Sequence, residues 1–195
     1  QAEHGNRASS TSRALGHVYK QKGRSVVGLA RGTVEVVPYQ GSWSDAYDAE
    51  VARLRSAVGD RVRQFEHIGS TAVEGMPAKP ILDVLAVVDE STTASDLVPA
   101  LETHGYERRP DDVDGRVFLA KGPPENRTCY LSIAEVGSAF HHEKIAFRDA
   151  LRSDPELAER YASLKRRLAA GYPENRQRYT AGKGAFVRAV LDRQD

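Results

Sequence analysis

The chain of 195 residues has little cysteine, few aromatic residues and no long apolar run. Its single cysteine, Cys129, excludes an internal disulfide and a cysteine-rich zinc site, which is typical of proteins from a reducing compartment. No segment approaches the roughly 18 apolar residues of a membrane span, and the first thirty residues lack the apolar part of a signal peptide. We therefore expect a cytoplasmic protein that does not bind a membrane.

The composition, 40% hydrophobic and 28% charged, is typical of a globular protein with one full core. Lys and Arg outnumber Asp and Glu by six to one in residues 1–33, and by twelve to eight in residues 141–195. Residues 34–140 carry ten basic side chains against eighteen acidic ones. This distribution is compatible with a site for an anionic ligand, or with two solvated helix faces. Basic residues are not interleaved with aromatic ones, so nucleic acid is not an expected partner.

Residues 1–32 are polar and rich in Gly, Ser and Arg, and we expect a flexible basic arm of which a part can dock. Residues 33–195 would then form a single domain. Apolar runs bounded by turn residues predict the strands Thr33–Val37, Val62–Ile68, Ile81–Val88, Val117–Ala120 and Thr128–Glu135.

Helical spacing predicts the remaining elements. Trp43, Tyr47, Val51, Leu54 and Val58 form an apolar stripe, with Ser42 or Ser44 as the N-cap and Gly59 as the stop. A short helix is predicted at Ser95–His104, and longer ones begin at Ser138 and at the Asp154 cap. A last helix carries Tyr179, Phe186 and Val190 inward. Mixed elements followed by helices alone indicate the α+β class.

Asp83 is the one charged residue inside the apolar run Ile81–Val88. A buried, unpaired carboxylate costs several kcal/mol, roughly, unless hydrogen bonds, a cation or a metal offset it. We therefore expect the Asp83 carboxylate to meet Lys79, a helical arginine or lysine, or a bound cation.

Gly69 and Ser70 follow the predicted strand that ends at Ile68, about a dozen residues before Asp83. Backbone N–H groups and a hydroxyl placed after a strand can bind phosphate oxygens, although most Gly-Ser pairs are plain turns. This arrangement resembles the nucleotidyltransferase superfamily, in which a Gly-Ser turn holds the triphosphate and aspartates on the next strand hold magnesium.

Four longer segments are more specific: HIGSTAVEGMPAKPILD, GRVFLAKGP, IAFRDALRSDPELAERYASLKRRLA and YTAGKGAFVRAVL. Together they resemble the GrpB family of small bacterial proteins, over roughly Val34 to Leu191. The resemblance implies a nucleotidyltransferase-like α+β fold, a mixed sheet with helices packed on it and a helical C-terminal segment.

The resemblance also implies a polar core. By position it falls on His67, Gly69, Ser70, Thr71, Lys79, Asp83, Arg116, Lys121, Arg148, Tyr161, Lys165, Tyr179 and Lys183. Asp83, Lys79 and Arg148 are the candidate catalytic residues, with Asp83 as magnesium ligand or base, and the others are candidates for nucleotide or substrate binding. Gly69, Ser70 and Lys79 would hold phosphates, while Arg148, Lys165 and Lys183 would neutralise developing charge.

The helical members of this set share helix faces. Tyr161 and Lys165 are four residues apart, as are Tyr179 and Lys183, and Lys144 also precedes Arg148 by four. These side chains would converge on the sheet as an anion clamp. Alternatively, the tyrosines are core residues and the lysines extend from its edge.

The sequence departs from the family pattern at two places. GrpB members usually carry a His-x-His strand after the KGP hairpin, where this chain has Tyr130 and Ser132, which neither bind metal nor move protons well at neutral pH. Glu74 replaces the usual proline of STAVPG. The chain is therefore either a specialised or a degenerate member.

A magnesium site would be incomplete. A two-metal transferase needs carboxylates at i and i+2 of the strand, and here that pair is Asp83 and Leu85. Glu66, Glu74 or, least favourably, Glu135 would have to complete a single-metal site. Magnesium held by one or two carboxylates and nucleotide phosphates remains chemically acceptable.

Two functions stay open. The first is an enzyme that binds ATP or another NTP, with Mg²⁺, and activates or modifies a small molecule by nucleotidyl transfer or by adenylation leading to amide formation. The second is a non-catalytic nucleotide- or anion-binding module that has lost the chemistry, which the missing second aspartate and the absent histidines favour. The sequence does not indicate the acceptor, the base or the oligomeric state.

Overall fold

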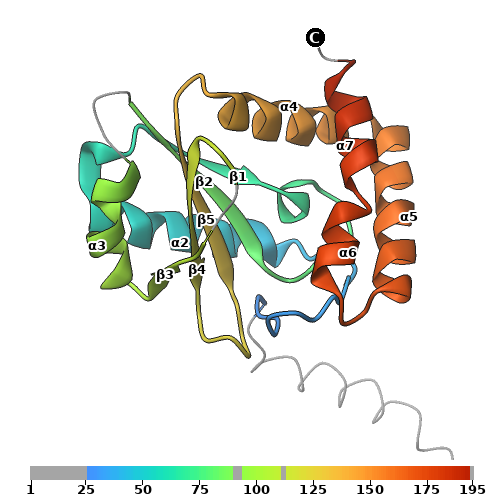
Figure 1. Ribbon diagram of the computed structural model, residues 1–195, viewed down its shortest axis with the longest axis horizontal. Helices are drawn as coiled ribbons and strands as arrows, with labels where there is room; N and C mark the ends of the chain where they lie inside the picture. Colours follow the sequence, from blue (N-terminus) through green and yellow to red (C-terminus); the bar gives the residue numbers. More distant parts are fainter. Residues whose placement is uncertain (1–25, 90–93, 111–112, 194–195) are drawn as a thin grey trace, which may run out of the picture.

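A computed structural model describes residues 26–89, 94–110 and 113–193, and its centre is a five-stranded mixed sheet (Figure 1). The strand order is β1-β2-β5-β4-β3. The strands are β1 Gln64–Ile68, β2 Leu82–Val88, β3 Tyr106–Arg108, β4 Arg116–Lys121 and β5 Cys129–Glu135. Only the central pair, β2 and β5, is parallel; the other neighbours pair antiparallel.

Helices cover both faces of this sheet. The helices α2 (Ser42–Val58) and α3 (Val98–Glu102) pack on one face with the main core, which includes Trp43, Leu54 and Leu101. On the other face lies α4 (Ala139–Ser153), whose Phe140 packs on Leu85 and Val87 of β2. Figure 1 shows α5 (Pro155–Gly171), α6 (Arg176–Ala181) and α7 (Gly184–Leu191) grouped with α4. Short 3₁₀ turns are η1 (Gly59–Arg61), η2 (Ser70–Ala72) and η3 (Ala94–Leu97).

Strand alternation decides which way Asp83 points. Successive side chains of a strand face opposite sides of a sheet, so Asp83 shares a face with Leu85 and Val87. Those two residues pack against α4, whereas Leu82 and Val84 belong to the core under α2. Asp83 therefore faces the group of helices α4 to α7.

The mixed sheet with packed helices and a helical C-terminal part confirms the predicted α+β class. The predicted cap at Asp154 is correct, since its side chain accepts a hydrogen bond from the first helical turn. Ser138, where a helix was predicted to begin, caps α4 in the same way. The cap predicted at Ser42 or Ser44 is wrong, because α2 begins after Gly41 without a side-chain cap. The hairpin of Val117–Ala120 with Thr128–Glu135 is found as β4 and β5.

The strand predicted at Thr33–Val37 is also wrong. Only Val37 pairs, through both of its backbone groups, with Ala78. Thr33 closes a turn with its N–H on Ala30, and Pro38 offers no N–H to extend the pairing beyond Val37. The edge strand β3, only three residues long, was not predicted; it follows directly on the turn at Gly105.

Most of the predicted arm, residues 1–25, lies outside the described residues. Its last part packs on the domain: Leu29 is buried and pairs with Arg127, and the Trp43 indole donates a hydrogen bond to the Val26 carbonyl at 3.2 Å. Within the described residues, none of the helices has the length and apolar character needed to cross a membrane.

Candidate functional site

The turn after β1 lies directly against Asp83. Ile68 pairs with Asp83 across β1 and β2, and Gly69 then leaves the strand with φ of +70°. A Cβ added at Gly69 would lie 2.6 Å from Asp83 Oδ2, so only glycine lets the backbone approach the carboxylate this closely. The structure thus brings together the Gly-Ser turn and the aspartate that the sequence separates.

Four cationic side chains surround Asp83. Burial raises the pKa of the Asp83 carboxyl, and the positive charges of Lys79, Lys183, Arg176 and Lys144 oppose that rise. Within the described residues, the carboxylate forms no ion pair and accepts no hydrogen bond. The expected cations are therefore present, but at a distance that leaves the carboxylate without a direct partner.

The Tyr179 ring makes cation–π contacts with two of these lysines. Its buried ring lies 4.5 Å from Lys183 Nζ and 5.7 Å from Lys79 Nζ. Burial, together with the neighbouring positive charges, lowers the pKa of Lys79 to about 8 and that of Lys183 to about 8. An anion placed between these amines would favour their charged forms.

Lys165 is almost completely buried, with 1% of its surface exposed. Its Nζ donates to Ser70 Oγ at 2.8 Å and to the Pro77 carbonyl, and lies 5.0 Å from the ring of Tyr161. Burial, reinforced by Lys183, Arg166 and Lys79, lowers the pKa of Lys165 to about 7. Both predicted tyrosines are thus core residues whose rings also contact the lysines.

Arg176 and Tyr130 complete this region, although neither was among the predicted site residues. The Arg176 guanidinium lies 4.8 Å from the Tyr130 ring and donates to its hydroxyl at 3.0 Å. A signal was available, because Arg176 precedes Tyr179 by three residues, which places both on one face of α6. We use the name cation chamber for Lys79, Asp83, Lys144, Lys165, Arg176, Tyr179 and Lys183 together with Ser70.

Arg116 lies on the same face of the sheet, further from Asp83. It pairs with Ala134 at the far end of β4, and its guanidinium lies 4.8 Å from the Phe118 ring and 5.0 Å from the Phe140 ring. It contributes to the lowered pKa of Lys144, whose main cause is burial. Arg116 thus borders the chamber through Lys144.

Arg148 does not join the cation chamber. Its guanidinium is paired with Glu66 and with Asp149, at 2.8 Å for the latter, and donates to the His67 carbonyl at 3.1 Å. These hydrogen bonds outweigh the effect of burial and raise the pKa of Arg148. Its contacts fix α4 to β1, so the geometry gives no support to a catalytic role.

Lys121 lies on the opposite face of the sheet. Its Nζ contacts Glu50 of α2 at 2.6 Å, and Glu50 also accepts a hydrogen bond from the Tyr106 hydroxyl at 2.7 Å. The register explains the separation: Lys121 pairs with Cys129, one residue before the strand position that faces Asp83. The predicted role of Lys121 in ligand binding is not supported by this placement.

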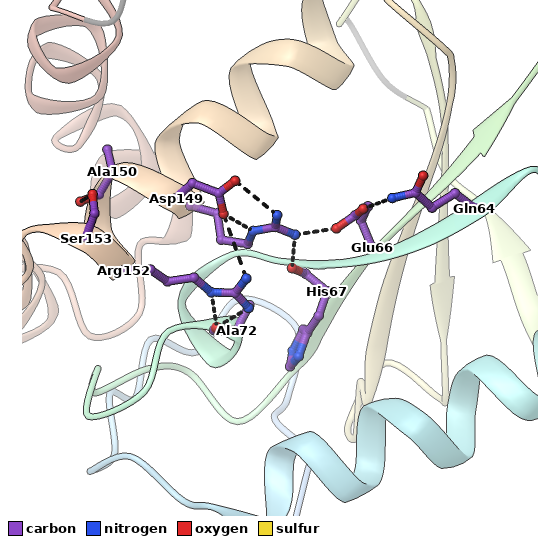
Figure 2. A network of polar contacts seen from close by, with 9 residues as sticks. Gln64, Glu66, His67, Ala72, Asp149, Ala150, Arg152 and Ser153 are labelled. Atoms are coloured by element: carbon purple, nitrogen blue, oxygen red, sulfur yellow. Dashed lines mark hydrogen bonds and ion pairs between the residues drawn. The ribbon is translucent and has the colours of Figure 1, made fainter.

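His67 and Thr71 point to a separate cavity behind η2. Their side chains form a 2.9 Å hydrogen bond, and the His67 ring stacks on Tyr47 at 4.4 Å. Burial, with help from Arg152 and Arg148, lowers the pKa of His67 to about 4. The cavity has a volume of about 560 Å³, and its lining includes Tyr39, His67, Thr71, Met76, Leu151 and Arg152. Arg152 also holds η2 in place through two hydrogen bonds to the Ala72 carbonyl (Figure 2).

The donor set around Asp83 does not fit a magnesium cage. Among the described residues, no group of three or more His, Cys, Asp and Glu side chains could hold a metal. Glu66 is occupied by Arg148 and Glu135 lies exposed on the other face of the sheet. The groups nearest Asp83 are cations, which suit the oxygens of an anion and not a divalent metal.

Comparison with known proteins places the chain in a family. The model described as "GrpB protein" matches residues 33–193. The chain belongs to the GrpB family. A UPF0157 protein of Halalkalibacterium halodurans is 35% identical over 164 residues, which cover 83% of this chain and 82% of that protein. The UPF0157 protein YqkA of Bacillus subtilis is 33% identical over 158 residues, and there the match spans only 46% of the relative's length.

The crystal structure of GrpB from Enterococcus faecalis superposes with a TM-score of 0.74 and 32% identity, covering 82% of this chain and 96% of that one. Family membership and the α+β fold, both expected from the sequence motifs, are thereby confirmed.

Proposed function

We propose that this GrpB protein binds a nucleoside triphosphate in the cation chamber and uses it to activate or modify a small molecule. The observation that carries the proposal is the arrangement of four cations around one carboxylate that has no direct partner among the described residues. Phosphate groups supply the missing negative charge and accept charge-assisted hydrogen bonds from amines and guanidinium groups. The reaction would be nucleotidyl transfer, or adenylation of a carboxylic acid that leads to an amide.

The individual roles follow from position. Lys79, Lys183 and Arg176 would bind phosphate oxygens, because they are the cations most strongly coupled to Asp83. Asp83 would accept a proton or orient the acceptor. The cavity behind η2 falls in the volume range of small-molecule sites, and it borders the same turn, so we assign it to the second substrate.

Magnesium is not assigned a ligand set. Asp83 is the one carboxylate in the chamber, and the positive charges around it would take over the neutralisation of the phosphates that a metal supplies elsewhere. Nucleotide binding is therefore expected to depend on magnesium only weakly.

Titration calorimetry with ATP, GTP, CTP, UTP and pyrophosphate, each with and without magnesium, tests this proposal. Lys183→Ala should weaken binding of the preferred nucleotide by about 1–3 kcal/mol, the range of a charge-assisted hydrogen bond. Arg63→Ala is the matched control, because it removes one positive charge from an exposed pair with Asp89 outside the chamber. Equal affinities of the two variants, or no binding of any triphosphate, would contradict the proposal.

A non-catalytic anion-binding module is the second candidate. It is favoured by the lone Asp83 and by the Tyr130 hydroxyl, occupied with Arg176, where the family usually has a histidine. Release of pyrophosphate in the presence of candidate acids and amines separates the two functions: the enzyme releases it, and the module binds nucleotide without turnover.

A further inference from the structure

Ser70 and Lys165 form a pair that ligand binding alone does not explain. Lys165 is buried, whereas Ser70 is half-buried beside the exposed Gly69. Ser70 is thus the residue of the pair that a molecule from solution can reach. Besides Ser70, the Nζ atom contacts the Pro77 carbonyl, and a carbonyl can only accept a hydrogen bond. A neutral amine would satisfy both contacts, by donating to Pro77 and accepting the Ser70 proton.

The surroundings of Lys165 favour this neutral form. Lys183 and Lys79 of the cation chamber and Arg166 of α5 are the charges that act on its amine, and all three are positive. The ring of Tyr161 covers another side. With burial, these neighbours lower the pKa of Lys165 to about 7. No carboxylate lies within ion-pair distance of Nζ in the described part of the chain.

We propose that Ser70 is a nucleophile that accepts an acyl group, with the amine of Lys165 as its general base. A serine hydroxyl is a weak nucleophile until an adjacent base removes its proton, and a lysine can serve as that base. The 2.8 Å separation of Oγ and Nζ allows direct proton transfer. The acyl donor would be an activated carboxylic acid, such as an acyl adenylate.

The reaction balances in two steps. Ser70 Oγ attacks the acyl carbon, its proton passes to Nζ, and the bond from carbon to the phosphate oxygen breaks with the electron pair on that oxygen. An amine then attacks the Ser70 ester and forms the amide. The serine oxygen recovers the proton held on Nζ, and the proton lost by the amine goes to solvent. The identity of the natural acyl donor rests on the proposed function, but the reactivity of Ser70 does not.

The experiment uses the full chain and p-nitrophenyl acetate, a simple activated ester. Release of p-nitrophenolate should show a burst of one equivalent, and peptide mass spectrometry should place the acetyl group on Ser70. The rate should rise as the pH passes about 7, because Lys165 acts as a base in its neutral form. Lys165→Met should slow acetylation about 100-fold or more, the usual contribution of a general base.

Controls separate chemistry from folding. Ser70→Ala should show no burst while melting like the wild type, and Ser163→Ala, which removes an exposed helical serine bonded to Glu159, should react normally. Ser70→Cys should remain reactive. It changes the nucleophile and leaves Lys165 in place, so the inference stays testable if Lys165→Met fails to fold. Acetylation on a lysine, or an unreactive Ser70 in folded protein, would overturn the inference. Calorimetry with ATP on the same samples reports on the proposed function independently.

Discussion

Asp83, which is half-buried, and Glu50, which is buried, are two carboxylates with opposite surroundings. Glu50 contacts Lys121 at 2.6 Å and the Tyr106 hydroxyl at 2.7 Å. The pKa of Glu50 is lowered because the bonds to Lys121 and Tyr106 together exceed the effect of burial, whereas burial raises the pKa of Asp83. A charge with direct partners is part of the fold, while a charge held without them is available to a ligand.

Asp83→Asn should therefore keep the fold and lose the reaction. No direct ion pair or hydrogen bond of the Asp83 carboxylate is lost among the described residues, so the melting temperature should stay close to that of the wild type, while pyrophosphate release stops. Glu50→Gln is the matched control: it leaves Lys121 without its counter-charge and should cost about 3 kcal/mol of unfolding free energy. Urea denaturation of both variants measures this. A large loss of stability in Asp83→Asn, with turnover retained, would show that Asp83 is structural.

The His67 side chain leads to a prediction about the pH dependence of stability. Its pKa is lowered to about 4, chiefly by burial, against an unfolded value near 6.5. Between these values the unfolded chain binds more protons, so stability falls as the pH drops from about 6.5 to 4. The loss attributable to this group is at most about 3 kcal/mol. Urea denaturation at pH 7 and pH 4.5 should show a smaller pH effect in His67→Gln; an equal effect would contradict the assignment.

The turn from β1 into η2 is the element that builds the site. It brings Gly69 against Asp83 and presents Ser70 to Lys165 of α5. Arg152 of α4 fixes its other end through the Ala72 carbonyl. The turn is thus held by a strand and by two helices, which gives the short segment a defined position.

Gly69→Ala should destabilise the protein more than Gly75→Ala. Gly69 has φ of +70° with ψ of −170°, a region used almost only by glycine, and its new methyl group would also collide with Asp83. We expect a loss of about 3 kcal/mol or more. Gly75 has a similar φ of +74° but open space around it, so its loss should be about 1–2 kcal/mol. Denaturant unfolding compares the two, and equal losses would mean that the contact with Asp83 is unimportant.

At the scale of the whole molecule, the cation chamber exists because α5, α6 and α7 fold back over the sheet. Asp83 comes from β2, Lys144 from α4, Lys165 from α5, Arg176 from α6 and Lys183 from the residue before α7. Burial, reinforced by the neighbouring positive charges, lowers the pKa of Lys79 and of Lys183 to about 8. The cation chamber thus carries more positive than negative charge.

Anion affinity should therefore fall as the pH rises through about 8. A bound phosphate group raises the pKa of Lys79 and Lys183, so binding takes up protons near this pH. Above pH 8 each amine that must first be protonated costs roughly a factor of ten in affinity per pH unit. Protonation of Asp83 at low pH also strengthens anion binding, because it removes a negative charge that repels the anion. Calorimetry in two buffers of different ionisation enthalpy measures the uptake; an affinity constant from pH 7 to 10 would contradict it.

Much of this protein was determined by local sequence. Apolar periodicity predicts α2 and β2, and the Ser138 and Asp154 side chains cap their helices. The motif HIGSTAVEGMPAKPILD indicates the family and contains both the Gly-Ser turn and Asp83. These features depend on residues close together in the chain, where spacing alone fixes which side chains share a face. The isolated pairing of Val37 shows the limit, because a strand also needs a partner that the sequence does not reveal.

Only the tertiary structure decided which cations belong to the site. Lys79, Lys144 and Lys183 gather near Asp83. Lys121 instead lies across the sheet with Glu50, and Arg148 is paired with Glu66 and Asp149. In the sequence these side chains are equivalent basic residues near apolar segments. A long flexible side chain pairs with whichever carboxylate the strand register and helix packing bring within reach. The pairs of Lys121 with Glu50 and of Arg148 with Glu66 join residues more than 70 positions apart.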